Sequence, residues 1–141
     1  MMRSFTRKAA WIIPILFGAL IATYSISQTQ TAISPAELAK WLKEKPDAFV
    51  LLDVRTPEEH AEAHIPGTDL NIDYRLLKEK RDELPPKDAV IVVYCRSGHR
   101  SAIAYETLKA MGYEHLFNLE GGIRHWVEQG FPVESSRSSG Q

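Results

Sequence analysis

The sequence is poor in cysteine, since Cys95 is the only one among 141 residues. A single cysteine excludes an intrachain disulfide and zinc sites built from Cys-x-x-Cys pairs. The chain also lacks the Gly-x-Gly-x-x-Gly pattern of dinucleotide-binding sites. His60 and His64 have the spacing of a helical metal-binding pair, but not within the His-Glu-x-x-His pattern of zinc enzymes. We therefore expect no metal and no organic cofactor.

The sequence also has little excess charge of either sign. It contains 17 Lys and Arg against 18 Asp and Glu, a formal net charge of −1. Three basic residues, Arg3, Arg7 and Lys8, lie at the N-terminus, which leaves 14 against the same 18 acidic residues. This acidic balance argues against non-specific nucleic-acid binding. The 44% of hydrophobic residues is typical of one ordinary globular domain.

A long hydrophobic run occurs only near the N-terminus. Residues 9–22 carry no charged or strongly polar side chain and follow the three basic residues. Ser25 and Ser27 are small residues suited to cleavage before Gln28, so residues 1–27 match a secretory signal peptide. The alternative is an uncleaved anchor, because residues 9–26 are just long enough to span a bilayer. In both cases we expect export to a bacterial periplasm. The domain would be soluble after cleavage near Ser27 and otherwise held outside the inner membrane.

Helical and strand patterns alternate beyond a short polar linker at residues 28–32. Apolar runs predict buried strands over 48–53, 89–94 and 115–119, with a brief strand at 70–72. Helices are predicted over 34–45, 56–64, 74–84, 101–111 and 123–129. The Ser/Gly-rich residues 134–141 are expected to be a disordered tail. The alternation predicts one α/β domain over residues 33–133, with a parallel sheet covered on both faces.

The stretch from Val90 to Ser101 carries the reactive chemistry. An apolar strand leads into Cys95, and Arg96, Gly98 and Arg100 follow before a helix. The backbone amides of this loop can form a concave nest with the helix N-terminus behind it. The nest and the positive charges favour an anion, so we expect a lowered pKa for the thiol of Cys95. The competing interpretation is an inert cysteine of the core.

Four ordered motifs between Ile33 and Phe131 resemble those of the rhodanese sulfurtransferases. They are Asp53-Val54-Arg55 followed by Glu59, His64-Ile65-Pro66-Gly67 with Asn71-Ile72, the loop from Cys95 to Ser101, and Gly121-Gly122 with Trp126. The resemblance implies a rhodanese-like α/β fold, with a roughly five-stranded, mainly parallel sheet and helices on both faces. It also implies that Cys95 carries sulfur as a persulfide. His60 departs from the pattern, because the family usually has an aromatic residue there.

The resemblance implies a sulfurtransferase that moves a sulfane sulfur from a donor such as thiosulfate to a thiophilic acceptor, cyanide or a thiol. Cys95 is the predicted catalytic residue. The predicted substrate-binding residues are Arg96, Ser97, Gly98, His99, Arg100 and Ser101. Asp53 and Arg55 are expected either to brace the loop from the neighbouring strand end or to form a purely structural ion pair.

Two other functions remain open. A persulfide relay or rhodanese-like binding module would use the same loop with a protein partner, such as a thiol protein. A phosphatase or arsenate reductase would also use a cysteine and an arginine, but tyrosine phosphatases separate the two by five residues. Four residues separate Cys95 from Arg100, which favours a cradle for one extra sulfur atom over one for a tetrahedral phosphate.

Overall fold

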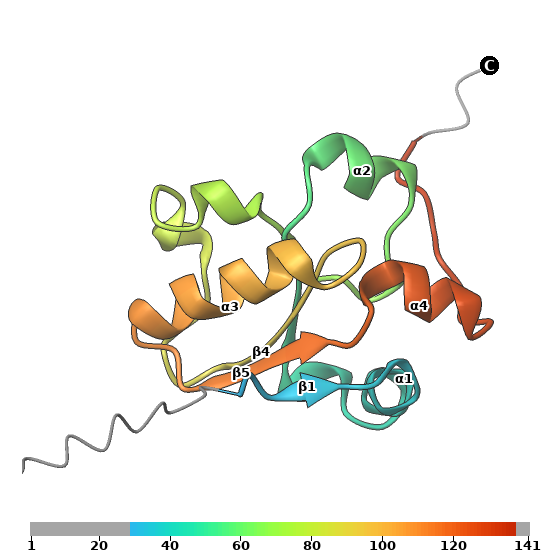
Figure 1. The fold of residues 1–141 in the computed structure, drawn as a ribbon, viewed down its shortest axis with the longest axis horizontal. Coiled ribbons are helices and arrows are strands. Elements are labelled where there is room, and N and C mark those ends of the chain that lie inside the picture. Colours follow the sequence, from blue (N-terminus) through green and yellow to red (C-terminus); the bar gives the residue numbers. More distant parts are fainter. Residues whose placement is uncertain (1–28, 138–141) are drawn as a thin grey trace, which may run out of the picture.

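The computed structural model describes residues 29–137 and shows a five-stranded sheet with helices on both faces (Figure 1). The strands lie in the order β1-β5-β4-β2-β3, and every pair is parallel. Their bounds are β1 Ala32–Ile33, β2 Val50–Asp53, β3 Leu70–Asn71, β4 Val90–Tyr94 and β5 His115–Leu119. The predicted α/β class with a five-stranded parallel sheet is therefore confirmed.

The first two α-helices begin where the sequence places capping residues. Ser34 Oγ accepts a hydrogen bond from the Glu37 amide, and Thr56 Oγ1 accepts one from the Glu59 amide. Each cap is followed by a proline, which suits the first helical position. The α-helices are α1 Pro35–Glu44, α2 Pro57–Glu62, α3 His99–Ala110 and α4 Gly122–Glu128. The short 3₁₀-helices are η1 Pro46–Ala48, η2 Tyr74–Leu76 and η3 Arg81–Glu83.

The strands bury alternate side chains on opposite faces. In β4, Ile91 and Val93 belong to the core beneath α3, whereas Val92 and Tyr94 belong to the core beneath α1 and α4. All four residues have no exposed surface. Because both faces are covered, β4 appears in the sequence as a continuous apolar run rather than an alternating one.

The predicted helix over residues 74–84 is wrong. The structure has η2 and η3 there, joined by turns. The Asp73 carboxylate accepts from the Arg75 amide and starts the first short helix. Leu77 is the fully buried residue of the segment, and the charged residues 78–83 are exposed. One buried side chain does not supply the apolar stripe that a three-turn helix needs for packing.

The described domain extends beyond both predicted ends. The carbonyl of Thr31 accepts from the Asn118 amide, and Ala32 belongs to β1, so this part of the predicted linker 28–32 pairs with β5. Glu134 forms an antiparallel bridge with His64, and the amides of residues 136 and 137 donate to the carbonyl of Ala61. Residues 134–137 are therefore not a free tail, because they satisfy backbone groups that α2 leaves unpaired.

The predicted signal peptide or anchor over residues 1–27 and the rest of the predicted tail, residues 138–141, lie outside the described residues. Between residues 29 and 137, no helix is long and apolar enough to cross a membrane.

The N-terminus of α4 packs directly against the Cys95 loop. The Ile123 amide donates to the carbonyl of Cys95 at 2.9 Å, and the Arg124 amide donates to the carbonyl of Arg96 at 3.0 Å. A Cβ at Gly122 would lie 2.5 Å from both carbonyl oxygens, and its φ of 63° is left-handed. The glycine at position 122 therefore lets the helix end approach the loop closely enough to bind it.

Replacing this glycine should destabilise the protein. Gly122→Ala adds a steric clash to the left-handed backbone penalty of about 1–3 kcal/mol. Gly130→Ala is the matched control, because Gly130 has a φ of 85° and open space around its Cα. We expect Gly122→Ala to lower the free energy of unfolding by about 1–3 kcal/mol more than Gly130→Ala, measured by urea denaturation. Equal losses in the two variants would contradict the importance of the close approach.

Candidate active site

Cys95 lies at the carboxyl end of β4, directly before the loop that leads into α3. Its side chain is buried, and Sγ accepts a hydrogen bond from the Gly98 amide at 3.1 Å. Gly98 has a left-handed φ of 105°, a conformation that glycine adopts without a side-chain penalty. This residue turns the chain back towards Sγ and precedes the first residue of α3. The loop therefore curves around the sulfur as the predicted nest, and we call residues 95–101 the cradle.

The surroundings of the Cys95 thiol lower its pKa. Burial alone raises the pKa, because the thiolate loses contact with water. The Ser101 hydroxyl, when its proton is turned towards the sulfur, acts in the opposite direction, as do the amides of Ser101, Gly98 and Ser97. Together they outweigh burial, so the pKa lies below the ordinary value of a thiol. This combination fits a reactive thiolate better than an inert core cysteine.

The two arginines of the loop have different surroundings. Arg100, in the first turn of α3, forms a two-pronged ion pair with Glu59 of α2. Its Nη1 lies 2.7 Å from Oε2, and its Nη2 lies 2.8 Å from Oε1. Arg96 is exposed and forms no ion pair with any residue between 29 and 137. Arg96 is therefore the loop arginine that is free to meet a substrate anion, while Arg100 is held by the protein.

Glu59 connects the start of α2 to the start of α3. Its carboxylate accepts from the Thr56 amide, which closes the capping box of α2, and it also binds Arg100. The hydrogen bond from Arg100 lowers the pKa of Glu59 to about 2, although burial opposes this shift. The site prediction did not include Glu59. The capping pattern located it in the sequence, but its partner lies 41 positions away along the chain.

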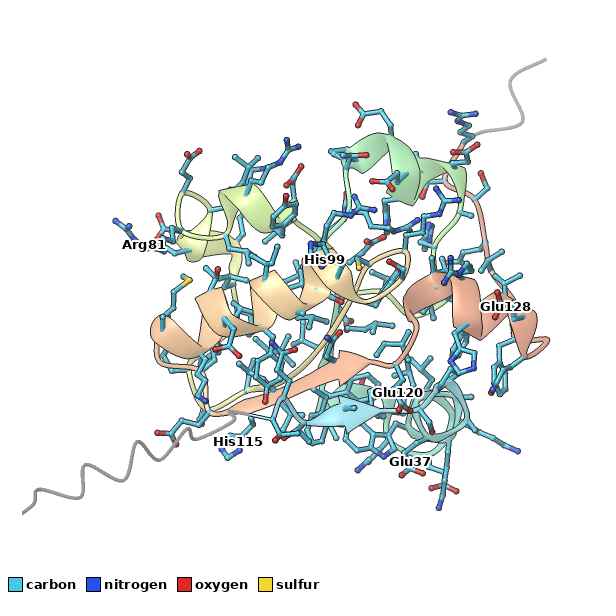
Figure 2. All side chains as sticks on the ribbon, in the orientation of Figure 1. Glu37, Arg81, His99, His115, Glu120 and Glu128 are labelled. Carbon is cyan, nitrogen blue, oxygen red and sulfur yellow. The ribbon has the colours of Figure 1, made fainter. Side chains whose placement is uncertain are left out.

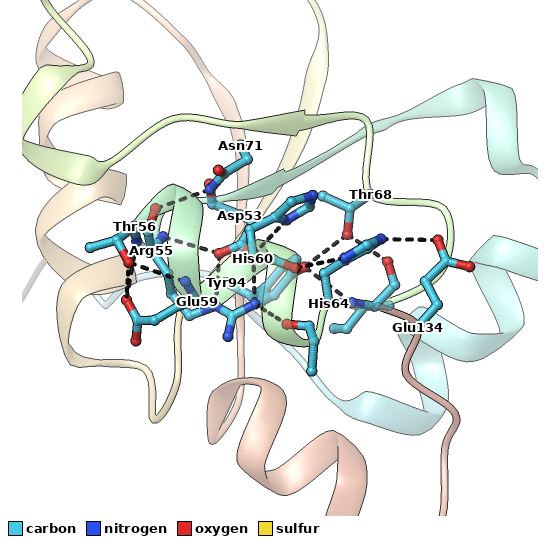
Figure 3. Close-up of polar contacts among 12 residues, drawn as sticks. Asp53, Arg55, Thr56, Glu59, His60, His64, Thr68, Asn71, Tyr94 and Glu134 are labelled. Atoms are coloured by element: carbon cyan, nitrogen blue, oxygen red, sulfur yellow. Dashed lines mark hydrogen bonds and ion pairs between the residues drawn. The ribbon is translucent and has the colours of Figure 1, made fainter. Parts of the chain in front are cut away.

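Asp53 and Arg55 form a buried ion pair beside the loop (Figure 3). Asp53 lies opposite Tyr94 in the register of β2 and β4, one position before Cys95. Arg55 donates through Nε and Nη2 to the two oxygens of Asp53, and its Nη2 also donates to the carbonyl of Ala63. Among residues 29–137, neither side chain reaches the loop 95–101 through a hydrogen bond or an ion pair. The pair instead fixes the end of α2, the helix that carries Glu59.

His60 and His64 continue this network towards the C-terminal segment (Figure 3). His60 Nδ1 lies 3.0 Å from Asp53 Oδ2, and the two imidazole rings stack at 4.0 Å. His64 Nε2 lies 3.0 Å from Glu134 Oε1. Within residues 29–137, no group of three or more His, Cys, Asp or Glu residues is arranged to hold a metal ion. The two histidines therefore connect α2 to the sheet on one side and to residue 134 on the other.

The remaining loop residues lie at the surface or in the wall of the cradle. Ser97 is exposed, as is His99 at the start of α3 (Figure 2). Ser101 is fully buried beneath the loop. A pocket of about 490 Å³ lies next to Arg96, between α2 and α4. Its lining includes Arg55, Glu59, Arg96, Arg124, Val127 and Val133.

The Glu59–Arg100 ion pair predicts a specific loss of stability in acid. The folded pKa of Glu59, about 2, lies below its ordinary value of 4.5. The contribution of the charged carboxylate is therefore fully present above about pH 4.5 and is lost as the pH falls towards 2. We expect the destabilisation caused by Glu59→Gln to be largest near neutral pH and to shrink below pH 4.5. Urea unfolding of both proteins between pH 7 and pH 2.5 measures this difference.

Glu62→Gln is the matched control, since Glu62 is an exposed residue of the same helix. Its effect on the free energy of unfolding should stay small across the pH range. A Glu59→Gln effect that does not change with pH would contradict the assigned role of the ion pair.

Comparison with known proteins supports the resemblance seen in the motifs. A family model for the rhodanese-like domain matches residues 34–129, which include Asp53, the Cys95 loop and Trp126. A sulfurtransferase of Allochromatium vinosum is 39% identical over 101 residues, or 72% of this chain and 92% of that protein. The thiosulfate sulfurtransferase PspE of Escherichia coli is 38% identical over 74 residues, or 52% of this chain and 69% of that protein.

A solved structure shows the same similarity in three dimensions. The rhodanese-related protein of Thermoplasma volcanium has a TM-score of 0.64 and 36% sequence identity. The alignment covers 74% of this chain and 97% of that chain. By its motifs, its parallel sheet and these matches, the chain belongs to the rhodanese-like domain family.

Proposed function

We propose that the protein is a rhodanese-type sulfurtransferase that carries sulfur as a persulfide on Cys95. The observation that carries this proposal is the cradle, in which the Gly98 amide lies 3.1 Å from Sγ at the start of a basic loop. The names of the relatives support sulfur transfer in general. The persulfide on Cys95, the donor and the acceptor are the specific parts of the proposal.

The first half-reaction loads the cysteine. The Cys95 thiolate attacks the sulfane sulfur of thiosulfate, the sulfur–sulfur bond of the donor breaks, and sulfite leaves with the bonding electrons. The negative charge then resides on the outer sulfur of the persulfide, where the loop amides can stabilise it. The exposed guanidinium of Arg96 suits the sulfonate oxygens of the donor.

The second half-reaction unloads the sulfur. A thiophilic acceptor attacks the outer sulfur, the persulfide bond breaks, and the Cys95 thiolate is regenerated. Cyanide would leave as thiocyanate, and a thiolate would leave as a persulfide. Because the first product departs before the acceptor reacts, the scheme predicts ping-pong kinetics.

The arrangement of the loop favours sulfur over phosphate. Arg100 is turned towards α2 by its two hydrogen bonds to Glu59. The groups directed at Sγ include the backbone amides of the loop, which suit one additional sulfur atom. The four residues between Cys95 and Arg100 support the same choice.

A sulfur relay to a thiol protein is the second candidate function. Val127 is 50% exposed and Val133 is 40% exposed, and both line the pocket beside Arg96. This apolar surface is larger than cyanide needs, and it could contact the chain around a protein thiol. We also propose that the domain acts in a bacterial periplasm, soluble or anchored, on the basis of the sequence of residues 1–27.

Removing the thiol should abolish sulfur transfer. Mass spectrometry of the wild-type protein after incubation with thiosulfate should show one added sulfur atom at Cys95, whereas Cys95→Ala should show none. The variant should also have no thiosulfate:cyanide activity. A phosphate or arsenate adduct in place of sulfur, or turnover by Cys95→Ala, would overturn the proposal. The mass of protein purified from an exporting host also shows whether residues 1–27 are removed.

Replacing the free loop arginine should weaken donor binding. Arg96→Ala removes a charge-assisted contact, so we expect KM for thiosulfate to rise about tenfold. The pocket residue Arg124 is the matched control, because its side chain is similarly exposed and lies 3.8 Å from Glu128. Arg124→Ala should change KM less than about twofold. Equal effects in steady-state kinetics would remove the special role of Arg96.

A further inference from the structure

A chain of side-chain amides connects the N-terminal segment to the cradle. Ser101 Oγ lies 2.7 Å from Asn118 Oδ1 on β5. Asn118 Nδ2 lies 3.1 Å from Gln30 Oε1. Gln30 Nε2 in turn lies 2.8 Å from the carbonyl oxygen of Ala102. These contacts place one continuous hydrogen-bonded path beneath the reactive loop.

The carbonyl of Ala102, at the end of the path, determines which group donates in each of its hydrogen bonds. The carbonyl of Ala102 can only accept, so Gln30 must present its amino group to it. Gln30 therefore presents its oxygen to Asn118, which donates through Nδ2. Asn118 is left with its oxygen facing Ser101, and an amide oxygen can only accept. The hydroxyl of Ser101 must then donate its proton to Asn118.

Ser101 has a single hydroxyl proton for several neighbouring acceptors. Its Oγ also lies 3.1 Å from the carbonyl of Gly98, and it is close enough to Cys95 to act on the thiol as a hydrogen-bond donor. A proton committed to Asn118 is not available to the sulfur. The 2.7 Å contact with Asn118 is the shortest of the hydrogen bonds that the structure gives this hydroxyl.

We propose that Asn118 is a positioning residue that holds the Ser101 hydroxyl proton away from Cys95 Sγ in the unloaded protein. The thiolate is then stabilised mainly by the backbone amides of the cradle. A thiolate with fewer hydrogen bonds keeps more of its nucleophilicity, because nucleophilic strength falls as the thiol becomes more acidic. The inference deepens the proposed function, since it concerns the sulfur that would attack the donor.

The test is the titration of Cys95 in a double-mutant cycle. Because Cys95 is the only cysteine, its alkylation by iodoacetamide as a function of pH reports this thiol alone. Ser101→Ala in the wild-type background should shift the midpoint of the curve of alkylation rate against pH by less than about 0.3 pH units. Asn118→Ala frees the hydroxyl to donate to the thiolate and should lower the midpoint by about one pH unit. Adding Ser101→Ala to Asn118→Ala should restore the wild-type midpoint.

A second variant tests the same path without altering the sheet. Gln30 precedes β1, so Gln30→Ala leaves every strand unchanged. It releases the orientation of the Asn118 amide and should lower the midpoint, by less than Asn118→Ala does. Glu106→Gln is the matched control. It changes the other acceptor of Gln30, at 3.1 Å, but keeps the Ala102 carbonyl that orients the amide, so the midpoint should not move.

The charged and titratable neighbours of Cys95 stay constant across the serine, asparagine and Gln30 variants. They are Asp53, Glu59, Arg96, His99 and Arg100. An unchanged midpoint in both Asn118→Ala and Gln30→Ala would overturn the proposal. So would a rise of about one unit in Ser101→Ala alone, because the hydroxyl would then already donate to the sulfur. Absence of sulfur transfer by the wild-type protein would instead overturn the proposed function and leave this titration interpretable.

Discussion

The cradle depends on two hydrogen bonds that hold the loop from outside. The amides of Ile123 and Arg124, in the first turn of α4, bind the carbonyls of Cys95 and Arg96. In a trans peptide the carbonyl and the amide of the next residue point in opposite directions. Holding the carbonyl of Arg96 towards α4 therefore directs the amide of Ser97 inward, where it acts on Sγ. The close approach at Gly122 and the left-handed turn at Gly98 both serve this one arrangement of the backbone.

The Cys95 loop is also held in place through contacts with α2. The buried pair Asp53–Arg55 binds the end of α2 at Ala63, and Glu59 at its start binds Arg100. The end of β2 and the short helix α2 thus fix the position of the first turn of α3. The two interpretations of Asp53 and Arg55 are compatible, because a structural ion pair here braces the loop indirectly. The C-terminal segment adds a further attachment to α2 through Glu134 and His64.

The prediction from sequence was correct where one residue pattern has one physical explanation. The apolar run before Cys95 forms β4, and the capped prolines at positions 35 and 57 begin α1 and α2. It failed for residues 74–84, where three leucines resembled a helical face but only Leu77 is fully buried. It also missed β1 and the bridge at Glu134, because a two-residue strand and a single bridge have no periodic signal.

The sequence by itself determined that a lone cysteine follows a buried strand, that a glycine and two arginines surround it, and that the fold is α/β. These properties depend on neighbouring residues, and local patterns express them directly. Only the tertiary structure decided which arginine is free, since Arg100 meets Glu59 across 41 positions and Arg96 meets no acidic residue within the described region. It also decided that Asn118, on β5, faces the Ser101 hydroxyl. Parallel strands bring distant segments to the same edge, and no local pattern records which side chains meet there.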